Sequence, residues 1–109
     1  MEISSYLSHI LDWSSIPKEE HKRETGIVKA RVFIMGDIRI RKVEYSAGYK
    51  ADHWCSKDHI ILCTEGEMLT KLDDRRAIKF TAGMSYFVSD DCDAHRSSTQ
   101  NGCNFFIGD

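Results

Sequence analysis

The sequence predicts an all-β fold, either a sandwich or a barrel. From Gly26 onward, short runs rich in β-branched and aromatic residues alternate with Gly, Asp, Ser and Asn turn residues. These breaks recur about every 8 to 12 residues, and no apolar stripe with the period of a helix is present. Short strands at this spacing are typical of closed antiparallel sheets.

Six segments are predicted to be strands, because each is a β-rich run bounded by turn residues. They are residues 27–35, 38–45, 59–72, 75–80, 84–88 and 103–107. The stretch "TKLDDRRAIKF" is predicted to be a hairpin with Asp73-Asp74 at its turn.

The first 25 residues are polar and carry no such run. "YLSHILDW" is compatible with a short helix or an arm, and "PKEEHKRETG" is predicted to be an exposed loop. A chain of 109 residues has room for one modest core. The predicted organisation is therefore an N-terminal arm or short helix over residues 1–25 and a single barrel domain over residues 26–109.

Charge and composition exclude several classes of protein. The formal net charge is −2 and no basic stripe is present, which argues against a nucleic-acid partner. No apolar run approaches the ~20 residues that span a bilayer, so no membrane partner is expected. The start "MEISSYLSHILDW" has an acid where a secretory signal has a basic region. We therefore expect a cytoplasmic protein.

The four cysteines are expected to be thiols, because no secretory signal accompanies them. No C-x-x-C pair occurs, which disfavours both a zinc ribbon and a thioredoxin-like redox pair. They are Cys55, Cys63, Cys92 and Cys103.

The stretch "ADHWCSKDHIILCTEGE" carries the clearest chemical pattern. His53, Cys55 and His59 are separated by even numbers of residues, so in extended chain all three project from one face. Cys63 shares that parity, but its expected role is packing. An imidazole, a thiol and a second imidazole on one face are potential metal ligands.

These residues resemble the two motifs of the cupin family. The first is matched by Gly48, His53-x-Cys55, His59 and Gly66, and the second by the span from Gly83 to His95. The second motif departs from the pattern, because Ser89 and Asp91 replace its proline and glycine. The resemblance covers residues 36–109 and is closest to the small single-domain cupins with a DHCW motif, a group without an assigned activity.

The resemblance implies a cupin double-stranded β-helix, a jelly-roll-like barrel, with a mononuclear metal site inside one end. Metal-binding cupins usually supply three histidines and one glutamate. Carried over position by position, the implied ligands here are His53, Cys55, His59 and His95. A thiolate in place of the carboxylate favours Zn²⁺, with Fe or Ni as alternatives, and disfavours Mn²⁺. The competing interpretation is that these are ordinary barrel-lining or surface histidines and a packed cysteine.

Four further side chains are candidates for catalysis or substrate contact. Tyr86 follows Gly83 and could point into the cavity, although a packed core tyrosine is the competing interpretation. Glu65 could act as a general acid or base, although it precedes a turn glycine and is expected to be solvated. Arg41, with Arg39, could bind a substrate carboxylate, provided that their face of the strand is internal.

Two functions remain open. The chain is either a small metal-binding cupin that holds a divalent metal and a small polar or carboxylate ligand, or a metal-dependent enzyme. The enzyme would be an Fe-type dioxygenase, or a Zn- or Ni-type isomerase, lyase or hydrolase. By analogy with cupins we also expect a homodimer, with residues 1–25 wrapping the barrel or crossing to the second subunit.

Overall fold

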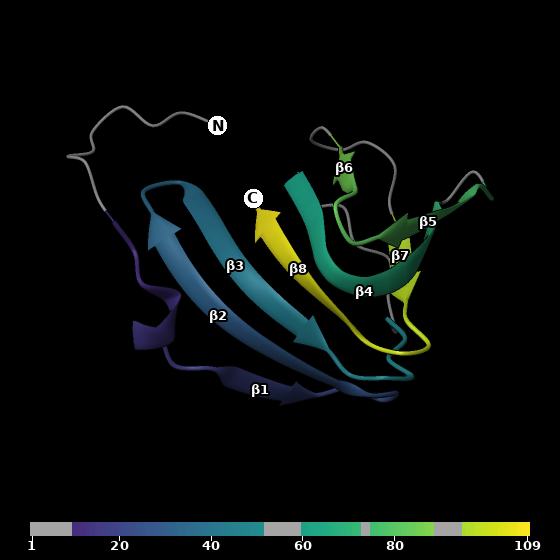
Figure 1. Ribbon diagram of the computed structural model, residues 1–109, viewed down its shortest axis with the longest axis horizontal. Helices are drawn as coiled ribbons and strands as arrows, with labels where there is room; N and C mark the ends of the chain where they lie inside the picture. The colour runs from purple at the N-terminus through teal and green to yellow at the C-terminus, as the bar shows by residue number, and fades with distance from the viewer. Residues whose placement is uncertain (1–9, 52–59, 73–74, 89–94) are drawn as a thin grey trace.

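The computed structural model describes residues 10–51, 60–72, 75–88 and 95–109, and the statements below concern these residues (Figure 1). They form a short 3₁₀ turn and a set of strands. The elements are η1 (Trp13–Ser15), β1 (Glu19–Lys22), β2 (Ile27–Met35), β3 (Ile38–Tyr45), β4 (Ile60–Leu72), β5 (Ala77–Thr81), β6 (Ser85–Phe87), β7 (His95–Ser98) and β8 (Cys103–Gly108). The predicted all-β class is confirmed.

The strands are antiparallel, in the order β1-β2-β3-β8-β4-β5. The long strand β4 links two parts of the structure and curves strongly between them (Figure 1). Its first half pairs with β8 and β6, so that Ile61 lies opposite both Ile107 and Tyr86. Its second half pairs with β5 and β7. One strand therefore contributes to both walls that enclose the core.

The bend in β4 has a local cause. The register with β8 shifts between Cys63 and Glu65, which marks a bulge. Gly66 follows with φ of +81°, a conformation that side chains other than glycine rarely adopt. A Cβ atom built at Gly66 would meet the carbonyl oxygen of Gly102 and would lie 2.8 Å from the Cα atom of Cys103. A glycine is therefore needed where β4 turns against β8.

The core lies between the walls and follows the alternation of the strands. Val28 and Ala30 of β2 face inward, as do Val43 of β3 and Phe105 and Ile107 of β8. The ring of Phe105 makes edge contacts with the rings of Tyr45 and Phe80 at centroid distances of 5.9 and 6.0 Å. These contacts join β8 to both β3 and β5.

The described part of the N-terminal arm packs on its own barrel. The carboxylate of Asp12 accepts a hydrogen bond from the backbone N–H of Ser14 at 3.0 Å and so caps η1. The ring of Trp13 contacts that of Phe106 edge-on, with centroids 6.3 Å apart. Arg31 Nη1 donates to the backbone oxygens of Trp13 at 2.5 Å and Ile16 at 3.2 Å. These contacts pack residues 13–16 against β2 and β8.

Several sequence predictions need correction or fall outside the described residues. "PKEEHKRETG" is exposed as predicted, but it is not all loop, because its residues 19–22 form β1 against β2. Strand β7 was not predicted. The hairpin of β4 and β5 is confirmed by the pairing of Lys71 with Ala77, whereas Asp73-Asp74 lies outside the described residues. Within the described ranges, no helix is long and apolar enough to cross a membrane.

Candidate functional site

Most of the predicted metal ligands lie outside the described residues. These are His53, Cys55 and His59. The fourth, His95, is the first residue of β7 and pairs in register with the buried Leu72 of β4. Within the part of the chain that the structure describes, no three His, Cys, Asp or Glu residues lie together as a metal-holding group.

The chain that enters the predicted site is nevertheless placed by its pairing with β7. Lys50 forms an antiparallel bridge with Ser98. The backbone N–H of Ala51 donates to the oxygen of Ser97 at 2.8 Å, and Arg96 Nε donates to the oxygen of Ala51 at 3.1 Å. Residues 50 and 51 therefore run along β7 in the direction of its first residue, His95.

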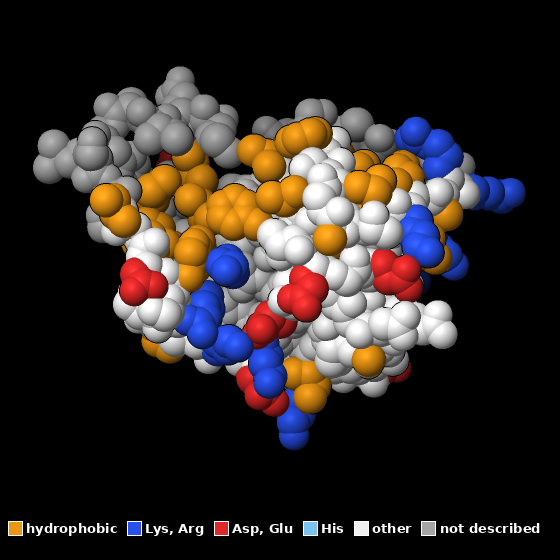
Figure 2. Space-filling view, in the orientation of Figure 1, with side chains coloured by type: hydrophobic (Ala, Val, Ile, Leu, Met, Phe, Trp, Pro, Cys, Tyr) orange, Lys and Arg blue, Asp and Glu red, His pale blue; other side chains and the backbone are white. Residues whose placement is uncertain are grey.

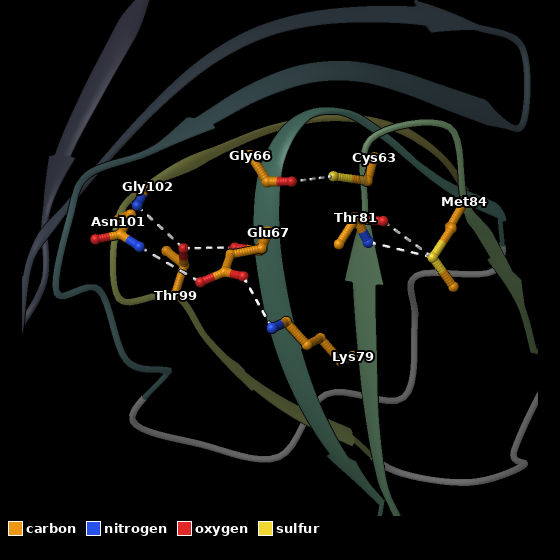
Figure 3. Close-up of polar contacts among 9 residues, drawn as sticks. All are labelled: Cys63, Gly66, Glu67, Lys79, Thr81, Met84, Thr99, Asn101 and Gly102. Atoms are coloured by element: carbon orange, nitrogen blue, oxygen red, sulfur yellow. Dashed lines mark hydrogen bonds and ion pairs between the residues drawn. The ribbon is translucent and has the colours of Figure 1, made fainter.

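Buried hydroxyl groups hold β7 and the turn after it in place. The hydroxyl oxygens of Thr70 and Ser97 lie 2.9 Å apart across the β4–β7 pair, and Thr70 is only 1% exposed. Thr99 Oγ1 donates to the backbone oxygen of Glu67 at 2.6 Å and accepts from the backbone N–H of Gly102 at 3.1 Å (Figure 3). Each buried hydroxyl thus has a partner, which fixes the position of β7 against β4.

The register of β3 shows on which face of the strand the two candidate arginines, Arg39 and Arg41, lie. Arg41 lies opposite Val32 and Ile107, and it is two residues from the buried Val43. Arg39 and Arg41 therefore belong to the inner face of the barrel wall, and Ile40 belongs to the outer face. The sequence had left this choice open.

Both arginines contact one carboxylate at the end of β8. Arg39 makes two hydrogen bonds to Asp109, from Nε to Oδ1 at 3.0 Å and from Nη2 to Oδ2 at 2.7 Å. Arg41 Nη2 lies 3.5 Å from the same Oδ2 atom, and the Asp109 side chain is 7% exposed. Two guanidinium groups and one nearly buried carboxylate therefore occupy the inner face where β3 begins and β8 ends.

Asp109 was missed by the sequence analysis. The available signal was parity, because Asp109 follows Ile107 by two residues and continues the inward positions of β8. The Thr70–Ser97 pair was also missed, since β7 itself was not predicted.

The other two candidates are placed differently. Tyr86 is half-buried, and its ring contacts the ring of Phe80 at a centroid distance of 5.7 Å. It packs against the core cluster, as the competing interpretation expected. Glu65 is exposed and accepts a hydrogen bond from Asn104 Nδ2 at 3.0 Å. Its neighbour Glu67 pairs with Lys79 Nζ at 3.1 Å (Figure 3).

Cys63 behaves as a packed core residue. It is 1% exposed, and its Sγ lies 3.5 Å from the backbone oxygen of Glu65 and 3.7 Å from that of Gly66 (Figure 3). Burial raises the pKa of its thiol. A neutral, enclosed thiol agrees with the packing role expected from the sequence.

Comparison with solved structures identifies the fold. An RmlC-like cupin from Shewanella frigidimarina NCIMB 400 superposes with a TM-score of 0.74 at 18% identity, over 94% of this chain and 89% of its own. Ectoine synthase from P. lautus gives a TM-score of 0.74 at 15% identity, over 93% of this chain and 76% of its own. The Cnp3 cupin domain of Schizosaccharomyces pombe gives 0.62 at 10% identity, over 74% and 59%.

At these identities the likeness shows the fold alone. The chain has the cupin fold, and that prediction is confirmed. No protein-family model matches the chain, and no curated protein matches its sequence.

Proposed function

Taking the cupin fold of this chain as the premise, we propose that it is a small metal-binding protein of the barrel interior. It holds one divalent metal ion and, beside it, a small polar or carboxylate-bearing ligand. The proposed metal ligands are His53, Cys55, His59 and His95. The protein is proposed to act in the cytoplasm.

The observation that carries the proposal is the pairing of residues 50 and 51 with β7. Lys50 lies opposite Ser98, and the next residue bonds to Ser97. In that register, each further residue along the chain moves one residue back along β7. This pairing therefore leads the chain along β7 towards its first residue, His95. His53 follows Ala51 by two residues in the sequence, and this direction of the chain supports a metal site shared with His95.

The donor set supports a soft or borderline metal. Three imidazoles and one thiolate are ligands that suit Zn²⁺, Fe or Ni better than Mn²⁺, and we propose Zn²⁺. When bound, such an ion supplies Lewis acidity or, if it is Fe, redox chemistry. The role of this chain's residues is to hold the ion and to orient the ligand beside it.

Arg41 is the proposed partner of the ligand's carboxylate. It lies on the inner face of β3, and its contact with Asp109, at 3.5 Å, is longer than the 2.7 Å contact of Arg39. Arg39 is already engaged by both oxygens of Asp109. A ligand carboxylate can therefore approach Arg41 while the Arg39–Asp109 pair remains formed.

A second candidate function is catalysis. The likeness in fold to ectoine synthase favours it, because a synthase shows that this barrel can house chemistry. The number of protein ligands separates the two functions. Four protein ligands would close a tetrahedral zinc site, as in structural sites, whereas three would leave a position for water or substrate.

Elemental analysis tests the proposal. The protein is purified without affinity tag or chelator, as wild type and as Cys55→Ala, His59→Ala and His95→Ala. The expected result is about one equivalent of metal in the wild type and a clear loss in each variant. His21→Ala is the matched control, since His21 is exposed on β1 and its loss should leave the metal content unchanged.

Two results would change the account. Metal that Cys55→Ala retains and His59→Ala loses would remove the thiolate from the set and favour catalysis. A wild type that contains no metal and takes up none on reconstitution would contradict the proposed function.

A further inference from the structure

A hollow on the outer face of the barrel gathers positive charge in a protein whose formal net charge is −2. It measures about 300 Å³ and lies over β2, β3 and the N-terminal segment. Five charged side chains line it: Lys18, Lys29, Arg31, Lys42 and Glu44. Figure 2 shows Lys and Arg side chains (blue) next to Asp and Glu side chains (red) on one face of the molecule. The charged β2 and β3 positions belong to the outer face of the wall, because they alternate with the buried Ala30 and Val43.

The register explains why the charges crowd. Arg31 and Lys42 are direct cross-strand partners, whereas Lys29, two residues before Arg31 on the same face of β2, lies opposite Glu44 of β3 and Glu20 of β1. Like charges placed directly opposite each other destabilise a pair of strands. Glu44 offsets part of this charge, but its carboxylate is engaged by Lys18 at 2.8 Å. Neither Lys29 nor Lys42 has an ion-pair partner among the described residues.

Two features give the hollow a fixed geometry. The Arg31 guanidinium is held by the backbone oxygens of Trp13 and Ile16, at 2.5 and 3.2 Å. The indole of Trp13 is half-buried, leans edge-on against Phe106, and forms one wall. A planar ring can stack on or beside such an indole, while lysines beside it attract an anion.

We propose that this hollow binds a small ligand that carries a phosphate group on a planar ring. The phosphate interacts with Lys29 and Lys42, with Arg31 behind them, and the ring lies against Trp13. A phosphate fits better than a single carboxylate, because several cations converge here and a phosphate monoester carries about −2 charge. The volume of about 300 Å³ suits a ligand of mononucleotide size. This site is independent of the proposed metal site.

Calorimetric titration with adenosine monophosphate tests the proposal, with adenosine and inorganic phosphate titrated separately. We expect the monophosphate to bind more tightly than either fragment. The Lys29→Ala/Lys42→Ala double variant should bind it roughly tenfold more weakly, because two ion pairs to the phosphate are lost. Lys22→Ala/Lys71→Ala is the matched control, because it removes the same charge from exposed positions outside the hollow. Its affinity should stay within about twofold of the wild type.

Amide and indole resonances locate the site independently of any variant. On addition of the monophosphate, the expected shifts are those of the Trp13 indole N–H and of the amides around residues 29–31 and 42–44. Absence of binding by the wild type would overturn the proposal. So would equal weakening in the control variant, or adenosine binding as tightly as its monophosphate. Shifts confined to the barrel interior would also contradict it.

Discussion

The two buried thiols of the described core, Cys63 and Cys103, stay protonated near neutral pH because burial raises their pKa. Cys103 is 4% exposed and Cys63 is 1% exposed. Burial raises the pKa of Cys103 to about 12, a hydrogen bond with Thr99 opposes this shift, and the neighbouring Cys63 adds to it. Because the thiolate is the reactive form, neither residue should react in the folded protein near neutral pH.

The raised pKa of Cys103 predicts a pH dependence of stability. Its contribution to the free energy of unfolding is fully present below the ordinary thiol pKa of 9.0 and is lost as the pH rises towards 12. The free energy of unfolding should therefore fall over this window, by at most about 1.4 kcal/mol per pH unit from this group. Urea unfolding of wild type and Cys103→Ala at several pH values measures the slope, which should be shallower in the variant.

Val43→Ala is the control for the thiol experiment, since it also removes buried volume but no titrating group. It should lower stability by about the same amount at every pH in the window. A Cys103→Ala slope equal to that of the wild type would contradict the assignment.

At the residue scale, the two-residue alternation along a strand predicted which positions share a face of the sheet. It did not predict which of the two faces points into the barrel. Cys63 was expected to pack because it falls where cupins place a core residue, and its burial agrees. The direction of Arg41 could not be predicted. Its strand is separated from the motif by an irregular loop, and only the pairing of Arg41 with Ile107 resolves the direction.

The bend in β4 depends on one backbone conformation. Gly66→Ala should destabilise the fold by about 3 kcal/mol, because a positive φ is strained for alanine and the added Cβ would meet the backbone of β8. Gly83→Ala separates the two causes, since Gly83 also has a positive φ of +91° but has no atom within 4 Å of an added Cβ.

Gly83→Ala should lower the free energy of unfolding by about 1 kcal/mol, because only backbone strain is introduced there. Denaturant unfolding of both variants measures the difference. Equal losses of stability in the two variants would contradict the expectation that the close approach of β4 and β8 adds to the cost of Gly66→Ala.

An ion pair joins the start of β3 to the end of β8, and its carboxylate is nearly buried, although the Arg39 side chain is 43% exposed. Asp109→Asn should cost about 1–3 kcal/mol, since it removes one charge of a bidentate pair and leaves two guanidinium groups side by side. Asp37→Asn, in the exposed turn between β2 and β3, should change stability by less than about 0.5 kcal/mol. The measurement is urea unfolding, and a loss shared by both variants would contradict the structural role of the Asp109 pair.

At the element scale, β-rich composition predicted the apolar strands well. The segments 27–35 and 38–45 correspond to β2 and β3 without change. Strands β1 and β7 were missed, because "EEHK" and "HRSS" have neither the composition nor the alternation of strands. Each forms because a longer neighbour offers backbone partners, β2 for the first and β4 for the second. Such tertiary pairing leaves no local signal.

At the scale of the whole molecule, the spacing of the β-rich runs predicted the all-β class, the resemblance to cupins implied the fold, and the solved structures agree with both. The candidate site is different. The resemblance to cupins implied four ligands, and of these the described residues place only the backbone of His95, through its pairing with Leu72. A ligand set depends on side-chain geometry that sequence parity cannot supply.

X-ray absorption at the metal edge of the native protein tests the proposed ligand set, because it reports the element and the atoms bound to it. We expect one sulfur ligand at about 2.3 Å and nitrogen ligands at about 2.0–2.1 Å for zinc. The sulfur contribution should disappear in Cys55→Ala and persist in Cys63→Ala. A shell of nitrogen and oxygen alone in the wild type, or a sulfur signal that survives Cys55→Ala, would contradict it.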